Sequence, residues 1–378
     1  MSTKLSLYFP KLYYGIVYNT HLSMSSKDTT TRRGVLAAIG TGATISIAGC
    51  LSGGSDEELQ FLGFGGNTQE AIMNVFEEWD SDVTVEGTSA AGTAEMISLI
   101  QQNPGTFDVI TFNDTGMARA HEEGVIEPVD VAELPNYEEN MDDEAQTLEY
   151  NMDGDDTMGL LLEHGATGYA YNTELVDEEL TSWDAILDPA YEGDVSLIDR
   201  TIDRLSNSAI AEGININNAP GDNDTIDQIF ERAEEEHQNV FSYWSDGATS
   251  IQYLREENGL IVEAWGGRVL ALQDDGYDHI EYVVPEEGAM GWADNFAIVE
   301  GTENRDSAHD LLNYAYEREN LLEMSDHMNY TIQVEDPPEE MMELPDYAPV
   351  SDLDFRNWDD LLPLEDEWTE RLETIKAS

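Results

Sequence analysis

Apolar residues in the first third of the chain alternate between two spacings. Short apolar runs predict strands, and apolar residues three and four positions apart predict helices, in the order strand 59–62, helix 67–79, strand 83–86, helix 93–102 and strand 107–112. Asn67 followed by Glu70 is typical of a capping box at the start of the first helix. This alternation predicts a parallel sheet whose ligand-binding groups lie at the carboxyl ends of its strands.

The middle of the chain repeats the alternation. A strand at 195–198 leads into a helix that carries Asp203, and a strand at 259–265 ends in glycines before a return helix. A further helix is expected at 307–316. Since the chain must cross several times between two such α/β lobes, we expect a hinge of two or three strands, which suits closure around a ligand.

Composition narrows the function. The 378 residues are enough for about two domains. With 80 acidic and 16 basic residues the formal net charge is −64, and a surface of that sign argues against binding to nucleic acid. After Cys50 the only lysine is Lys376. A dense carboxylate surface almost free of lysine indicates a halophilic, haloarchaeal source, because concentrated salt screens its self-repulsion.

The first 49 residues have the pattern of an export signal. Arg32 and Arg33 precede an apolar run that is too short to span a bilayer comfortably. This arrangement is typical of twin-arginine signals, and the ending Ile47-Ala-Gly-Cys50 resembles a lipobox, in which the cysteine is lipidated. The predicted signal therefore covers residues 1–49.

Cys50 is the only cysteine in the chain, which excludes intrachain disulfides and a cysteine-rich metal site. We expect a lipoprotein that is exported and anchored to the outer face of the cytoplasmic membrane through lipid on Cys50. Residues 50–57 would form its tether. Translation would begin at Met1 or at Met24, and a conventional-looking signal follows Met24.

Trp292 and Asp294 carry the clearest chemistry. They are two residues apart in a stretch that is predicted to be extended, so both side chains project to the same side. An aromatic face beside a carboxylate suits a cationic amine, through cation–π attraction and a charge-assisted hydrogen bond. The structural alternative is a strand end with one buried indole and one solvated carboxylate.

Three segments resemble the spermidine/putrescine-binding family, the extracellular solute-binding proteins that feed ABC importers. They are the Trp-x-Asp stretch at Trp292, the crossover at 163–172, and the segment 182–193. The resemblance implies an α/β fold of the type II periplasmic-binding-protein kind, with two lobes, each a mostly parallel sheet flanked by helices, and hinge strands between them. Lobe 1 would comprise 58–165 plus 295–330, and lobe 2 would comprise 166–294 plus 331–378.

The same resemblance implies a receptor that presents a polyamine or a related amine to a membrane permease, with transport energy from a separate ATPase. Within this chain no P-loop motif occurs. Two alternatives stay open: a receptor for a carboxylate, an amino acid or another anion or zwitterion, and, more distantly, a secreted hydrolase.

In that family, aromatic side chains sandwich the methylene chain of the ligand and carboxylates take its ammonium ends. The positions of this chain that we expect to contact the ligand are Trp292, Asp294, Asp203, Trp265, Phe64, Asn67, Asn113, Thr115, Arg200, Arg268 and Tyr330.

The match to the family pattern is incomplete. Phe64 and Asn67 stand where the family presents Trp and Tyr, and Thr115 replaces an aromatic. Arg200 falls near an expected acid. Guanidinium groups of Arg200 and Arg268 in the cleft would repel an ammonium and bind a carboxylate, whereas on the surface they would pair with neighbouring acids.

No catalytic residue, metal site or cofactor is expected. The seven histidines are scattered, and the sequence contains neither a His-Glu-x-x-His motif nor a Gly-x-Ser-x-Gly nucleophile elbow. Ferric-ion capture would need clustered tyrosines. Tyr169 and Tyr171 are close in sequence but lie in a predicted strand, which favours core packing.

Overall fold

The computed structural model describes residues 57–378, so the predicted signal, Cys50 and most of the predicted tether lie outside the described residues. The strands of the described part are β1 (Glu58–Phe64), β2 (Thr84–Ala90), β3 (Val109–Asn113), β4 (Ile126–Glu127), β5 (Met152–Asp153), β6 (Asp156–Thr157), β7 (Leu160–Asn172), β8 (Val195–Ile198), β9 (Val240–Trp244), β10 (Ile261–Trp265), β11 (Ile280–Val283) and β12 (Gly291–Val299).

Helices separate most of these strands. They are α1 (Asn67–Glu77), α2 (Thr93–Gln102), α3 (Asp114–Glu122), α4 (Pro135–Asn140), α5 (Thr201–Ala211), α6 (Asn223–His237), α7 (Gly247–Arg255), α8 (Gly266–Asp274), α9 (Arg305–Ala315), α10 (Arg318–Met328), α11 (Glu339–Met342), α12 (Trp358–Leu361) and α13 (Glu365–Lys376).

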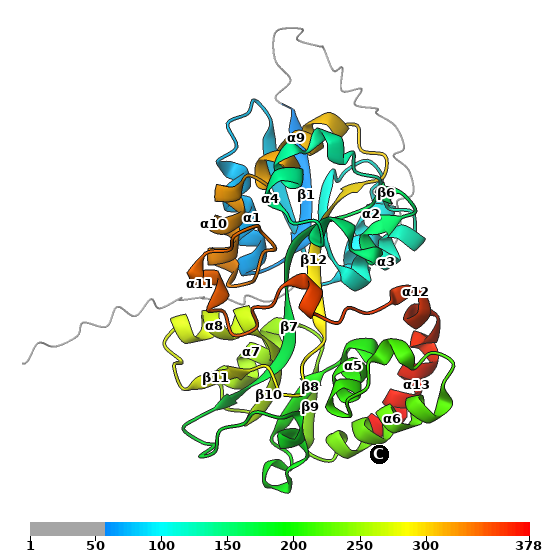
Figure 1. Ribbon diagram of the computed structural model, residues 1–378, viewed down its shortest axis with the longest axis vertical. Coiled ribbons are helices and arrows are strands. Elements are labelled where there is room, and N and C mark those ends of the chain that lie inside the picture. The colour runs from blue at the N-terminus through cyan, green and yellow to red at the C-terminus, as the bar shows by residue number, and fades with distance from the viewer. Residues whose placement is uncertain (1–56) are drawn as a thin grey trace, which may run out of the picture. The chain divides into compact units, whose positions relative to one another are not determined.

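Two parallel sheets are joined through two long strands (Figure 1). The hydrogen-bonded order is β2-β1-β3-β12-β7-β10-β8-β9, with β4 beside β12 and β11 beside β7. β1 is parallel to β2 and β3, and β8 is parallel to β9 and β10. β12 and β7 run antiparallel to their neighbours. The predicted two-lobed α/β architecture with hinge strands is therefore confirmed.

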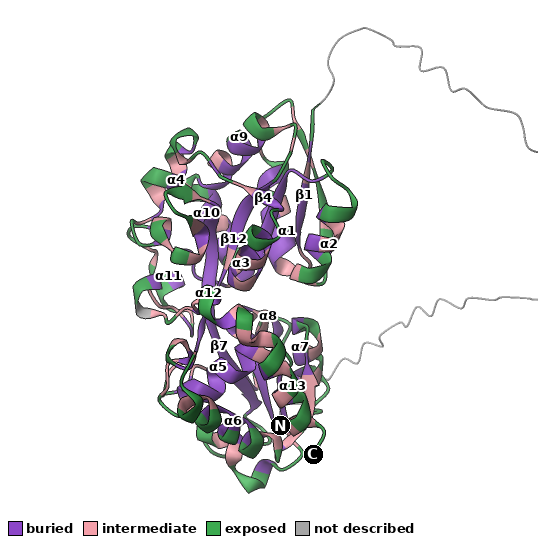
Figure 2. Cartoon of the chain, turned by 90° about the vertical axis from the view of Figure 1, so that its right-hand side faces the viewer, coloured by how far each residue is buried: buried purple, intermediate pink, exposed green. Residues whose placement is uncertain are grey.

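Strand β7 serves both lobes. Its first half pairs with β12, and its second half pairs with β10 and β11. All thirteen residues of β7 are buried, and Figure 2 shows the strand in the colour of buried residues. Because helices cover both faces of these sheets, β7 is buried at successive positions rather than at alternate ones.

Each lobe has an apolar cluster on either face of its sheet. In lobe 1, α1, α9 and α10 cover one face, and α2 and α3 cover the other (Figure 1). In lobe 2, α5, α6 and α13 lie on one face, and α7 and α8 lie on the other. This layering leaves the carboxyl ends of the parallel strands free at the side where the lobes meet.

After α10 the chain packs first on one lobe and then on the other. Ile332, Val334, Met341 and Val350 belong to the apolar cluster around α1 and α10. Trp358, Leu361, Trp368 and Leu372 belong to the cluster around α5 and α6. The division into lobes stays a prediction, and this packing associates residues 332–350 with lobe 1 although they were expected in lobe 2.

The first helix begins differently from the prediction. Gly66, not Asn67, is the residue before α1, and the helix has no side-chain cap. Gly66 has a φ of 103°, a conformation that favours glycine. Asn67 is already helical, and its Nδ2 donates to the carbonyl of Met328 at 3.2 Å. The capping box predicted at Asn67 and Glu70 was therefore wrong by one position.

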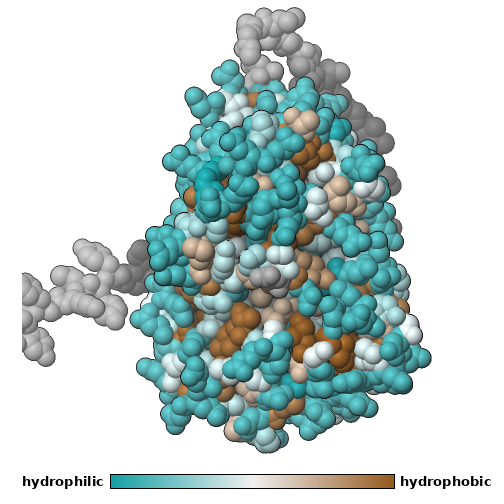
Figure 3. Space-filling view, in the orientation of Figure 1, coloured by the Kyte–Doolittle hydropathy of each residue, from teal (hydrophilic) through white to brown (hydrophobic). Residues whose placement is uncertain are grey.

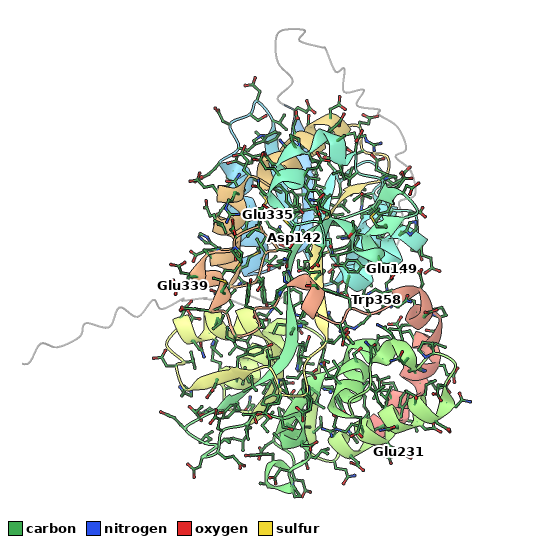
Figure 4. The ribbon with its side chains drawn as sticks, viewed as in Figure 1. Asp142, Glu149, Glu231, Glu335, Glu339 and Trp358 are labelled. Atoms are coloured by element: carbon green, nitrogen blue, oxygen red, sulfur yellow. The ribbon has the colours of Figure 1, made fainter. Side chains whose placement is uncertain are left out.

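The face seen in Figure 3 is mostly hydrophilic. Figure 4 labels the exposed Glu149, Glu231, Glu335 and Glu339, which lie on both lobes. This distribution agrees with a carboxylate surface spread over the whole described chain. Within residues 57–378, no helix has the length and apolar character needed to cross a membrane, and no cluster of potential metal-ligating side chains occurs.

Candidate functional site

A cavity of about 290 Å³ lies between the lobes, with side chains of β7 and β12 in its wall. The loops after β1, β2 and β3 line it from lobe 1, and the segments around the starts of α5, α7 and α8 line it from lobe 2. The cavity thus occupies the expected position at the carboxyl ends of parallel strands.

A carboxyl pair lies on the hinge side of the cavity. Asp294 on β12 is directly opposite Glu163 on β7, and on its other side it is opposite Asn113 at the end of β3. Glu163 is fully buried, and its Oε1 accepts a hydrogen bond of 3.3 Å from Thr68. Its Oε2 is buried without a hydrogen-bond partner in the described residues. Two carboxyl groups therefore face one another with little local compensation.

The electrostatics of this pair follow from its position. Burial raises the pKa of Glu163 well above its usual range, and the charge of Asp294 raises it further. Burial also raises the pKa of Asp294, to about 6, while Arg200 and Arg268 act in the opposite direction. The pair as a whole therefore retains a proton more readily than two isolated carboxyl groups, because two adjacent buried carboxylates do not ionise together readily.

Trp292 contributes an aromatic ring to the cavity wall beside the Glu163–Asp294 carboxyl pair. It lies opposite Gly165 on β7, and a Cβ on Gly165 would come within 2.8 Å of the indole. Glycine at this position therefore lets the ring lie against the strand. Tyr330 packs edge-to-face on Trp292, with ring centroids 4.8 Å apart. The sequence prediction that Trp292 and Asp294 project to one side agrees with both residues lining the cavity.

The wall from lobe 2 is different in character. Trp265 ends β10 and packs edge-to-face on the buried Trp244, with centroids 5.1 Å apart. The guanidinium carbon of Arg200 is 5.2 Å from the Trp265 ring centroid, and that of Arg268 is 5.7 Å from it. Both arginines line the cavity. Arg200 also lies 3.7 Å from the neighbouring Asp203, as the surface alternative expected of it.

Arg268 approaches the glycine loop of lobe 1. Its Nη1 is 3.7 Å from the position that a Cβ on Gly66 would take, and its Nε is 2.6 Å from the corresponding position on Gly247. The absence of side chains at these two glycines thus makes room for the guanidinium. Within residues 57–378, Arg268 forms no ion pair with a carboxylate, whereas Arg200 lies 3.7 Å from Asp203.

A third arginine links the lobes. Arg356 is almost fully buried, and its Nη2 lies 2.8 Å from Asp203 on α5. Its Nη1 lies 3.2 Å from Asp114 at the start of α3 and donates to the carbonyl of Gly291. Trp358, labelled in Figure 4, donates to the same Asp114 oxygen at 3.0 Å. Asp203 therefore has a strong protein partner before any ligand is considered.

Most of the side chains expected to contact the ligand come together here. Those that line the cavity are Trp292, Asp294, Asp203, Trp265, Phe64, Asn113, Arg200, Arg268 and Tyr330. Asn67 does not line it, because its side chain turns to Met328. Thr115 lines a neighbouring hollow of about 750 Å³, since it lies one residue inside α3.

Four charged residues of the cavity wall were missed from the sequence: Glu163, Asp114, Asp246 and Arg356. Glu163 is the first residue of the crossover segment 163–172, so the resemblance of that segment to the family could have suggested it. Asp114 directly follows the predicted Asn113, so the helix start after β3 could have suggested it. Arg356 reaches the site from the far end of the chain, and nothing local in the sequence indicates that.

The family is shown by comparison with known proteins. Residues 71–343 match the family model described as bacterial extracellular solute-binding protein. The chain belongs to this family, and it is thus a solute-binding receptor of the extracellular type.

Individual relatives agree with this assignment. Spermidine/putrescine-binding periplasmic protein 1 from Haemophilus influenzae is 26% identical over 266 residues, which cover 69% of this chain and 72% of the relative. The putrescine-binding periplasmic protein PotF from Escherichia coli is 25% identical over 281 residues, covering 69% and 71%.

A solved structure shares the fold. The spermidine/putrescine ABC transporter substrate-binding protein PotD from Streptococcus pneumoniae superposes with a TM-score of 0.71 at 20% identity. The match covers 85% of this chain and 99% of PotD. The inter-lobe cavity therefore belongs to a fold that solute-binding proteins use.

Proposed function

We propose that this protein is the extracellular receptor of an ABC importer and that it binds a small amine, of the polyamine or a related class, in the cavity between its lobes. The observation that carries the proposal is the pairing of Trp292 with the Glu163–Asp294 carboxyls on one wall. A cationic amine would lie against the indole and take the charge of Asp294. The spermidine- and putrescine-binding relatives support the same ligand class.

The role as a receptor also rests on the arrangement of the hinge. β7 and β12 pass from one lobe to the other, so a ligand held at Asp294 and at Trp265 would contact both lobes. A bound ligand would favour the closed arrangement, and a permease would recognise the two lobes held together. The residues of the cavity bind and orient the ligand and perform no chemistry on it. The ATPase that drives transport is a separate protein.

Trp292→Ala and Asp294→Asn test the proposed binding site for the amine. Each is expected to weaken amine binding at least about tenfold, roughly 1.4 kcal/mol, because each removes one half of the cation site. The measurement is calorimetric titration of the purified proteins in multimolar KCl with putrescine, spermidine and monoamines of the same chain length. Asp227→Asn is the matched control, since Asp227 on α6 forms an exposed ion pair with Arg371. Unchanged affinity in both test variants would overturn the site.

The proposed location is the outer face of the cytoplasmic membrane, with lipid on Cys50 as the anchor. The lipobox-like ending of the signal supports this location, and export agrees with the extracellular family. Cys50→Ser should release the processed protein into the medium, as followed by fractionation of cells. Retention of the variant in the membrane fraction would contradict the lipid anchor.

A further inference from the structure

The second wall of the cavity carries more positive charge than an amine receptor needs. Arg200 and Arg268 both lie on Trp265, an aromatic side chain that lobe 2 contributes to the cavity wall. Arg268 has no carboxylate partner in the described residues, and Arg200 has only Asp203, at 3.7 Å. These two guanidinium groups are therefore available to a ligand.

The acids of this wall are already engaged. Asp203 lies 2.8 Å from the buried Arg356. Asp246 caps α7, because its side chain accepts hydrogen bonds from the backbone nitrogen and the hydroxyl of Thr249, at 3.0 and 2.8 Å. Both acids therefore already have partners within the protein before a ligand binds. A diamine with one end on Asp294 would place its other end beside two cations.

The backbone adds to the same preference. Arg200 is the residue before α5, and Arg268 lies in the first turn of α8, so the positive ends of two helices point toward this wall. Helix N-termini favour negative charge, and a guanidinium binds a carboxylate through two parallel hydrogen bonds. Together they form an anion-binding wall on the lobe 2 side of the cavity.

From this we infer that the ligand carries a carboxylate as well as an ammonium group, and that Arg268 and Arg200 hold the carboxylate against Trp265. The inference rests on the proposed function, since the ammonium end remains at Trp292 and Asp294. The ligand is then an ω-amino acid or a similar zwitterion with its two charges at opposite ends.

The spacing of Asp294 and Trp265 along β7 limits the length of such a ligand. Glu163 is opposite Asp294, and Thr167 is opposite Trp265, so the two positions are four residues apart on β7. Four extended residues span about 13 Å. The guanidinium of Arg268 is nearer to the carboxyl pair than this spacing, because its charge lowers the pKa of both Glu163 and Asp294. The backbone spacing is therefore an upper bound on the distance between the two charges of the ligand.

Calorimetric titration of the purified protein in multimolar KCl tests the inference. The probes are ω-amino acids with chains of two to six carbons, the diamines of the same lengths, the corresponding monoamines, and the corresponding monocarboxylates. The expected result is that at least one ω-amino acid binds at least about tenfold more tightly than the diamine and the monoamine of equal length.

Arg268→Gln identifies the residue responsible. It should weaken binding of the best ω-amino acid at least about tenfold and should not weaken binding of the monoamine, because the ammonium loses the repulsion of one cation. Arg268→Lys keeps the charge but loses the planar pair of donors, so it should recover only part of the loss. Arg255→Gln is the control, because Arg255 forms an exposed ion pair with Asp275 outside the cavity.

The outcomes separate the two proposals. If diamines bind more tightly than every ω-amino acid and Arg268→Gln leaves their affinity unchanged or raises it, the zwitterion is overturned and the amine receptor stands. If only the monocarboxylates bind, or none of the probes does, the amine site fails and both proposals fall.

Discussion

Two groups of arginines in lobe 2 differ in how their charges are met. In the core, the buried Arg204 pairs with Glu236 and Glu263, and the buried Arg232 pairs with Glu236, Asp184 and Glu212. In the cavity, Arg268 has no such partner within the described residues. The core group is complete without a ligand and the cavity group is not. In a cavity, an arginine without a carboxylate partner therefore indicates a ligand-binding site.

The carboxylates of the core network accept hydrogen bonds in addition to forming ion pairs. Glu263 accepts from the backbone nitrogen of Ile198 at 2.7 Å and from Asn207 at 2.6 Å, and it pairs with Arg204. Glu236 accepts from Ser208 at 2.7 Å. Such hydrogen bonds help to offset the desolvation of the buried carboxylates, whereas Nε and Nη2 of Arg204 have no hydrogen-bond partner in the described residues. The network therefore holds β8, β10 and α5 in register.

Glu263→Gln should have the largest effect on stability. It removes the charge that faces the buried guanidinium of Arg204, and breaking a buried pair from one side costs about 3–5 kcal/mol. Chemical denaturation in multimolar KCl measures the loss. Arg255→Gln, in an exposed pair, should cost less than about 1 kcal/mol. Equal losses in the two variants would mean that the core network contributes no more to the free energy of unfolding than a surface ion pair does.

The carboxyl pair of the cavity should make amine binding depend on pH. Binding of an ammonium needs Asp294 ionised, and burial raises the pKa of Asp294 to about 6. Affinity should be level above pH 7 and should fall by up to about tenfold for each pH unit below 6. Titrations between pH 5 and 8 measure this slope, and Asp294→Asn should remove most of it. A flat profile in the unaltered protein would contradict the role of the pair.

The same pair should act on stability with the opposite sign. The pKa of Asp294 in the folded protein, about 6, lies above its usual value of 3.8. Between these values the folded state binds more protons than the unfolded state, so the contribution of Asp294 to the free energy of unfolding rises as the pH falls. Acidification would therefore weaken binding without any loss of stability from this group, which separates the two effects experimentally.

Much of the fold could be predicted because it depends on local spacing. The predicted helix at 93–102 has the bounds of α2, and the predicted strand at 195–198 has those of β8. The start of α1 was misplaced by one residue because a capping box is a statistical pattern, whereas the backbone of Gly66 decides the helix start here. Periodicity thus locates elements better than their ends.

The cavity could be predicted only in part. Trp292 and Asp294 were found because both are set by one strand. The exposure of Arg268 to the cavity depends on Gly66 and Gly247, which come from two other segments and leave room for its guanidinium. Arg356 takes part only because the chain returns after α11 and crosses between the lobes. Such long-range contacts leave no pattern in a single sequence.

Arg268→Gln should have the smallest effect on the free protein. Since Arg268 lacks an ion-pair partner, its removal should change the free energy of unfolding by less than about 1 kcal/mol, the contribution of its contact with Trp265. The loss of repulsion from Arg200 acts in the opposite direction. Denaturation without ligand, compared with Glu263→Gln under the same conditions, measures the difference.

Bound ligand should increase the effect of Arg268→Gln on the free energy of unfolding. A saturating ligand stabilises the folded protein according to its concentration relative to the dissociation constant. The unaltered protein should gain stability from an ω-amino acid, and the Arg268→Gln variant should gain less at the same concentration. A loss of 3 kcal/mol or more in the free variant would instead place Arg268 with Arg204 as a structural residue. The distinction between satisfied and unsatisfied arginines would then fail as a guide to the site.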